Sequence, residues 1–137
     1  MGHGPSNEQM EQRQALNKFH MEALVKSKRN GKNKDVSIVD VRESFEVKKY
    51  GAIPFSVHIP SSEVRNAFLM SPAAFEARYK ARMPDKYDKI VFYDQRHGRA
   101  VAAAELVESL GYTSATVFVD GYAGWLKSID NAGREDL

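Results

Sequence analysis

The chain of 137 residues contains no cysteine. This absence excludes disulfide bonds, metal sites built from thiolates and catalysis by a thiol nucleophile. An excess of one charge is also missing, because 20 lysines and arginines nearly balance 18 aspartates and glutamates and leave a net charge of +2. So small a net charge gives no indication of a nucleic-acid partner.

Long hydrophobic runs are missing as well, and so are signal-peptide and transit-peptide patterns. No apolar stretch approaches the roughly 20 residues that a membrane-spanning helix needs, so the sequence predicts no association with a membrane. No signal-peptide pattern is present, and Glu8 and Glu11 argue against a transit peptide. A cytoplasmic protein is therefore expected.

The length of the chain predicts a single domain with a hydrophobic core of its own. Residues 1–7 are expected to form a disordered leader, residues 8–130 the domain, and residues 131–137 a flexible tail. Nothing in the sequence indicates an oligomeric state.

Short apolar runs alternate with helical patterns along the domain. Clusters of β-branched and aromatic residues predict strands at 36–41, 56–60, 89–93 and 115–119. Helical spacing of apolar residues predicts helices at 8–28, 71–81, 99–111 and 121–129. Nearly continuous apolar strands that alternate with helices predict an α/β protein with a parallel sheet covered on both faces.

Some helix ends and faces can also be predicted. Ser71 is expected to cap the helix at 71–81, with Pro72 at its first position. Gly111 is expected to end the helix at 99–111. In the first helix the spacing favours a buried face that includes Leu16 and Phe19, with an alternative in which Phe19 opens a short edge strand.

The predicted strands end in polar sequence, which marks the candidate site. In open α/β sheets ligands bind beyond the carboxyl ends of the strands. The loop after the strand at 89–93 must turn sharply into a helix, so its N–H groups and the positive end of the helix dipole should favour an anion. Yet the first residue of this loop, Asp94, is itself an acid.

Four stretches in this order make the chain resemble the single-domain rhodanese-like (thiosulfate sulfurtransferase-like) family. They are "IVDVRESFEVKKYGAIPFSVHIP", "SPAAFEARY", "VFYDQRHGRA" with "AAELVESLGY", and "VDGYAGW". The resemblance implies a three-layer α/β/α fold with a parallel sheet of five strands, or of four and a short edge strand. It also implies an active loop of the form Cys-x-x-x-x-Arg, in which the cysteine takes sulfane sulfur from thiosulfate or a persulfide.

The loop departs from the family pattern at its first residue, because Asp94 occupies the cysteine position. His97 stands where the family usually has glycine, and Gly98 follows it. In other motifs, Ala52 replaces a common histidine and Asp120 replaces the first glycine. The length of six residues from Asp94 to Arg99 still matches the sulfurtransferases rather than the related cell-cycle phosphatases, whose loop is one residue longer.

Asp94 allows a catalytic and a structural interpretation. As a catalytic group it would be a phosphate acceptor or a general base, whereas sulfur transfer needs a nucleophile that tolerates an S–S bond. As a structural group it would accept N–H bonds of the loop in place of the persulfide anion, and this interpretation is favoured because those N–H groups otherwise need an outside anion.

The sequence thus favours a pseudoenzyme, a catalytically inactive rhodanese-like domain that acts as a binding or regulatory module. The alternatives are a sulfurtransferase whose cysteine has been replaced, an enzyme that handles other anions on the same loop, and a purely structural protein. A protein partner or a small anion is compatible with the first hypothesis, and no cofactor is expected.

The expected binding loop consists of Asp94, Gln95, Arg96, His97, Gly98 and Arg99. The expected supporting residues are Asp40, Arg42, Asp120 and Gly121.

Individual roles can be assigned to four of these residues. Arg99 is expected to bind Asp94 or another nearby carboxylate, and Arg96 and His97 at the crest of the loop are expected to meet an anionic partner. Arg42 is expected to hold neighbouring loops together through Glu43, Glu46 or Asp120. No metal is expected, because Asp94 and His97 supply only two ligands.

Overall fold

The computed structural model describes residues 15–127. The leader expected at 1–7, the tail expected at 131–137 and the first part of the helix expected from residue 8 lie outside the described residues. Within the described range, none of the helices has the length and the hydropathy needed to cross a membrane.

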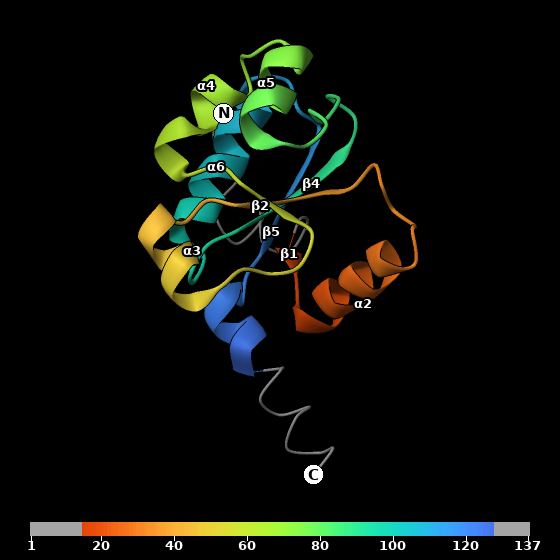
Figure 1. Ribbon diagram of the computed structural model, residues 1–137, viewed down its shortest axis with the longest axis vertical. Coiled ribbons are helices and arrows are strands. Elements are labelled where there is room, and N and C mark those ends of the chain that lie inside the picture. The colour runs from red at the N-terminus through yellow and green to blue at the C-terminus, as the bar shows by residue number, and fades with distance from the viewer. Residues whose placement is uncertain (1–14, 128–137) are drawn as a thin grey trace, which may run out of the picture.

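The core of the fold is a sheet of five parallel strands (Figure 1). The strands are β1 (Ala15–Leu16), β2 (Ser37–Asp40), β3 (Ser56–His58), β4 (Lys89–Tyr93) and β5 (Ser114–Phe118). Their order across the sheet is β1-β5-β4-β2-β3. Because β1 has only two residues, the sheet consists of four strands and a short edge strand, one of the two arrangements expected.

Helices connect the strands. They are α2 (Lys18–Arg29), α3 (Ser44–Tyr50), the 3-10 turn η1 (Ser61–Glu63), α4 (Val64–Ala67), α5 (Pro72–Tyr79), α6 (Gly98–Ser109) and a helical segment at 121–127. The predicted start of α5 is confirmed, since the Ser71 side chain accepts the N–H of Ala74 at 3.2 Å and Pro72 is the first helical residue. Gly111, two residues after α6, has the positive φ of 101° that ends the helix.

Two hydrophobic clusters, one on each face of the sheet, make the fold a three-layer α/β/α sandwich. Alternate strand residues such as Val39 and Phe92 point to the face covered by α4, α5 and α6. The intervening residues, such as Ile38 and Val91, point to the face covered by α2 and the segment 121–127. Figure 1 shows α2 on one side of the sheet and α4, α5 and α6 on the other.

The N-terminal part of the domain differs from the expected continuous helix. Ala15 and Leu16 form strand β1, and α2 begins only after Asn17, whose side chain accepts the N–H of His20 at 2.9 Å. The edge strand therefore exists but does not involve Phe19. Phe19 is 69% exposed, because α2 turns a different face, that of Met21, toward the sheet.

Candidate functional site

The loop between β4 and α6 carries a buried acid at its base and exposed basic groups at its crest. Asp94 directly follows the buried Tyr93 and is itself only 4% exposed. Arg96 and His97 are exposed, and α6 begins at the next residue. The six residues predicted as the binding loop thus bring an inward carboxylate and an outward basic surface together at the carboxyl end of the sheet.

Both carboxylate oxygens of Asp94 are engaged within the loop itself. The N–H of Gln95 donates to one oxygen at 2.6 Å, and the N–H of Arg99 donates to the other at 2.8 Å. The Arg99 guanidinium adds an ion pair at 2.7 Å. The expected pairing of Arg99 with Asp94 is confirmed, and the charge of the acid is balanced by Arg99 and the two N–H donors.

A second acid, Glu46 on α3, holds the same guanidinium from the other side. Arg99 donates to the two oxygens of Glu46 at 2.7 and 3.0 Å, a bidentate arrangement. The hydrogen bond from Arg99 lowers the pKa of Glu46, and Glu46 in turn, with Asp94, raises the pKa of Arg99. Arg99 is therefore a cation shared by two acids.

The sequence analysis named Glu46 only as a possible partner of Arg42, whereas the structure pairs it with Arg99. Glu46 also accepts the backbone N–H of Glu43 at 2.9 Å, as the third residue of a helix does in a capping box. The spacing Glu43-Ser44-Phe45-Glu46, which begins three residues after the end of β2, is the signal that could have predicted a helix start, and with it an acid near the loop.

A second carboxylate–guanidinium pair lies buried beneath the loop. Arg42 binds Asp40 through Nη2 at 2.7 Å and through Nε at 3.0 Å, and both residues are fully buried. The expectation that Arg42 binds Glu43, Glu46 or Asp120 is wrong. Arg42 follows Asp40 by two residues in extended chain, so both side chains point to the same face of the sheet.

The rest of the Arg42 guanidinium contacts the loops around it. Nη2 donates to the carbonyl of Gly51 at 2.7 Å, and Nη1 donates to the Gln95 side chain at 3.3 Å. The ring of Tyr122 lies 4.2 Å from the guanidinium carbon. Arg42 therefore contacts the candidate loop through the side chain of Gln95.

Tyr93, which the sequence analysis did not single out, completes this buried network. Its hydroxyl donates to Asp40 at 2.8 Å and accepts the N–H of Ile53 at 3.1 Å. Burial, together with the charge of Asp40, raises the pKa of Tyr93, so the phenol keeps its proton. The network has its donors and acceptors paired, as a buried charge requires.

Gly121 and Asp120, the last two predicted supporting residues, have different roles. Gly121 has a φ of 65°, and a Cβ built on it would lie 2.2 Å from the carbonyl oxygen of Arg96. Only glycine permits this close approach. Asp120 instead accepts the N–H of Lys18 at 3.1 Å and so anchors the start of α2.

The segment that Gly121 opens also holds the candidate loop directly. The N–H of Tyr122 donates to the carbonyl of Asp94 at 2.8 Å, and the N–H of Ala123 donates to the carbonyl of Gln95 at 3.1 Å. Across residues 15–127, potential metal ligands do not gather in groups of three or more. The geometry is thus that of a braced loop with a basic crest.

Comparison with known proteins identifies the fold. Residues 22–128 match the sequence profile of the rhodanese-like domain. The chain belongs to the rhodanese-like domain family.

The relatives include named sulfurtransferases. The thiosulfate:glutathione sulfurtransferase of Homo sapiens is 42% identical over 91 residues, which cover 66% of this chain and 78% of that protein. A Mus musculus protein, thiosulfate sulfurtransferase/rhodanese-like domain-containing protein 3, is 35% identical over 94 residues, 69% of this chain but only 60% of that protein.

A solved structure agrees with this assignment. The human single-domain sulfurtransferase TSTD1 superimposes with a TM-score of 0.73 at 35% identity, over 82% of this chain and 95% of that one. The family and the α/β fold with a parallel sheet are therefore shown, as the motifs predicted.

Proposed function

We propose that this rhodanese-like domain does not transfer sulfur and acts as a binding or regulatory module, with Asp94 filling the pocket that a persulfide would occupy. The observation that carries the proposal is the state of Asp94, whose oxygens accept two backbone N–H groups and bind Arg99. A carboxylate cannot form the S–S bond that sulfur transfer requires, and the chain has no cysteine to replace it.

The crest of the loop is the surface that we propose a partner recognises. Arg96 and His97 are exposed, and within residues 15–127 neither forms an ion pair with an acid. Their basic groups suit an acidic protein segment or a small anion that approaches from outside, while the inner anion position is taken by Asp94. We propose the cytoplasm as the compartment.

Sulfur transfer tests the first half of the proposal. The parent protein, incubated with thiosulfate and cyanide, should produce no thiocyanate above the buffer rate, whereas Asp94→Cys should carry an added sulfur atom by mass spectrometry. Saturable thiocyanate production by the pure parent would refute the pseudoenzyme. An Asp94→Cys variant that folds but takes up no sulfur would show that the loop has diverged beyond this one residue.

Anion binding tests whether Asp94 fills the pocket. Like charges at close range repel strongly in a site shielded from water, so Asp94→Ser should bind sulfate and thiosulfate more tightly than the parent in calorimetric titrations. Arg99 and the loop N–H groups would then be available to the added anion. Equal or weaker binding by the variant would refute the filled pocket.

Partner capture tests the crest. Immobilised parent protein and the double variant Arg96→Ala/His97→Ala are compared with Lys34→Ala, which removes an exposed basic group before β2, at the opposite end of the sheet. A partner of the crest should be retained by the parent and by Lys34→Ala but lost with the double variant. Identical retention by all three proteins would favour a purely structural domain.

A further inference from the structure

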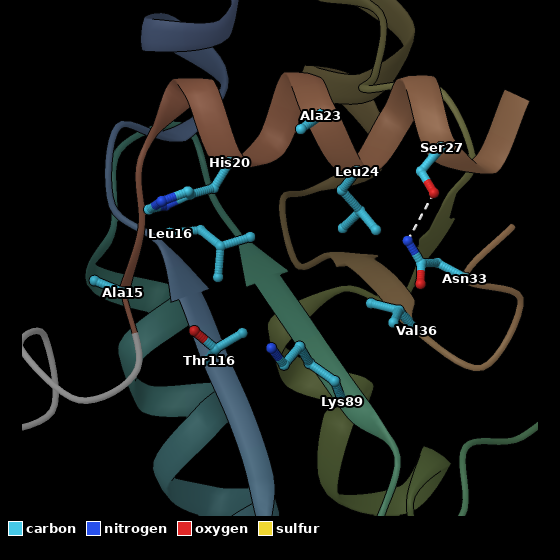
Figure 2. A pocket seen from close by; sticks show the side chains of 10 residues that line it. All are labelled: Ala15, Leu16, His20, Ala23, Leu24, Ser27, Asn33, Val36, Lys89 and Thr116. Carbon is cyan, nitrogen blue, oxygen red and sulfur yellow. Dashed lines mark hydrogen bonds between the residues drawn. The ribbon is translucent and has the colours of Figure 1, made fainter.

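A cavity of about 670 Å³ lies between α2 and the sheet, away from the candidate loop (Figure 2). Lys89, on its wall, is the first residue of β4, whereas Asp94 follows the last residue of that strand. On β4 the cavity therefore touches the amino end, whereas the candidate loop follows the carboxyl end. Its volume is within the range of small-molecule sites.

Thr116 supplies the observation that indicates a ligand. It lies in β5, is only 3% exposed, and its hydroxyl has no hydrogen-bond partner among residues 15–127. A buried hydroxyl without a partner costs free energy, so native proteins rarely keep one unless another group satisfies it. Figure 2 shows the side chain directed from β5 toward α2, at the wall of the cavity.

Lys89 places a positive charge on the same wall of the cavity as this hydroxyl. In the register of the sheet, Lys89 of β4 is opposite Ser114 of β5, so Thr116 is its diagonal neighbour on the same face. The Lys89 side chain extends toward Thr116 in Figure 2, and no acid in the described part of the chain pairs with it. Lys89 and Thr116 are thus two separate donors on one wall of the cavity.

The remaining walls of the cavity are largely apolar. Leu16, Leu24 and Val36 contribute side chains from β1, from α2 and from the residue before β2 (Figure 2). None of the ten described residues that line the cavity is acidic. The cavity thus combines an apolar body with a cationic donor group on one wall.

We infer that this cavity binds a small amphipathic monocarboxylate. Its carboxylate would accept hydrogen bonds from the Lys89 ammonium and from the Thr116 hydroxyl, and its apolar body would contact Leu24 and Val36 under α2. This inference does not depend on the proposed function of the loop, because the two sites share no residue.

Calorimetric titration of the full chain with decanoate tests the inference. We expect saturable binding of one decanoate per chain, with amide chemical-shift changes in α2 and β5 and none in the loop 94–99. Decan-1-ol, which has the same chain without the charge, should bind at least about tenfold more weakly, as the loss of a charged hydrogen bond predicts. Absence of saturable decanoate binding, or shifts confined to the loop, would overturn the inference.

Lysine variants test the charge. Lys89→Gln should weaken decanoate binding about tenfold, whereas Lys86→Gln, which removes an exposed lysine outside the cavity, should leave it within about twofold. An equal loss of decanoate affinity in both variants would mean that binding depends only on the net charge of the protein. Ala23→Trp, which places an indole in the cavity from α2, should abolish binding while the protein stays folded.

Thr116→Val separates recognition from packing, because valine has nearly the same shape without the hydroxyl. The variant should have a higher Tm in the absence of ligand, since an unpaired buried group is removed, and should bind decanoate several-fold more weakly. A higher Tm with unchanged decanoate affinity would mean that the hydroxyl takes no part in recognition, and would overturn its assigned role.

Discussion

Two carboxylate–guanidinium pairs near the carboxyl ends of neighbouring strands, Asp40–Arg42 and Asp94–Arg99, differ in burial. Asp40 and Arg42 meet at 2.7 Å with side chains 1% and 0% exposed, whereas Asp94 and Arg99 meet at 2.7 Å with side chains 6% and 35% exposed. The contact distance is the same in both. Only the second pair reaches solvent, and only there can a change of partner occur without unfolding the core.

The difference in burial predicts different costs when one member of each pair is removed. A buried pair cannot lose one member without leaving an unpaired charge, which is costly. Arg99, in contrast, has two acids to bind, so the loss of Asp94 still leaves it paired with Glu46. The three predictions below test this contrast, beginning with the largest expected effect.

Arg42→Met should destabilise the protein by about 3–5 kcal/mol, because it leaves the buried carboxylate of Asp40 uncompensated. The free energy of unfolding from urea titration measures the loss. Arg82→Met, which breaks the exposed pairs of Arg82 with Asp85 and Asp88, is the matched control and should cost no more than about 1 kcal/mol. Similar losses in the two variants would remove the distinction between the buried and the exposed pairs.

Asp94→Asn should cost an intermediate amount, about 1–3 kcal/mol at pH 7, because the amide keeps the shape of the side chain but loses charge-assisted bonds. Its NH₂ group would face a donor that it cannot accept from. Thermal and urea unfolding of both proteins provide the measurement. An Asn variant as stable as the parent would mean that the Asp94 carboxylate faces solvent and is displayed to a partner.

Glu46→Gln should have the smallest effect, about 0.5–1.5 kcal/mol at pH 7, since Arg99 keeps its ion pair with Asp94. Arg99 lowers the folded pKa of Glu46 below its ordinary value of 4.5. The stabilisation is therefore fully present above about pH 4.5 and is lost as the pH falls through the folded pKa. Urea titrations should show a difference in unfolding free energy between parent and variant that becomes smaller in this acid range. A difference that stays constant with pH would contradict the stabilising role of ionised Glu46.

The sequence predicted those parts of the fold that carry a periodic apolar signal. The strand expected at 89–93 is β4, residue for residue, because its apolar run is bounded by polar residues. Helix α3 was not predicted, and the structure explains the omission: none of its residues is buried, so it has no hydrophobic face for the sequence to reveal. Helix α4, with four residues, is too short to show a period.

In the candidate site, too, contacts within one loop could be predicted from the sequence, whereas contacts made by packing could not. The pairing of Asp94 with Arg99 was predictable because both lie in one loop of six residues. Glu46, 53 residues from Arg99 in the chain, reaches it only through the packing of α3 against the loop. The cavity beside Thr116 likewise depends on how α2 packs against the sheet, and no local sequence pattern predicts this packing.

The hydrogen bonds between the segment 121–127 and the loop make the fluorescence of Trp125 sensitive to the loop. Trp125 is the only tryptophan in the chain, is 7% exposed, and lies on the segment whose N–H groups bind the carbonyls of Asp94 and Gln95. Any rearrangement of the loop must move these carbonyls and therefore alter the surroundings of the indole. Intrinsic fluorescence, excited at the tryptophan band, should register binding at the loop without any added label.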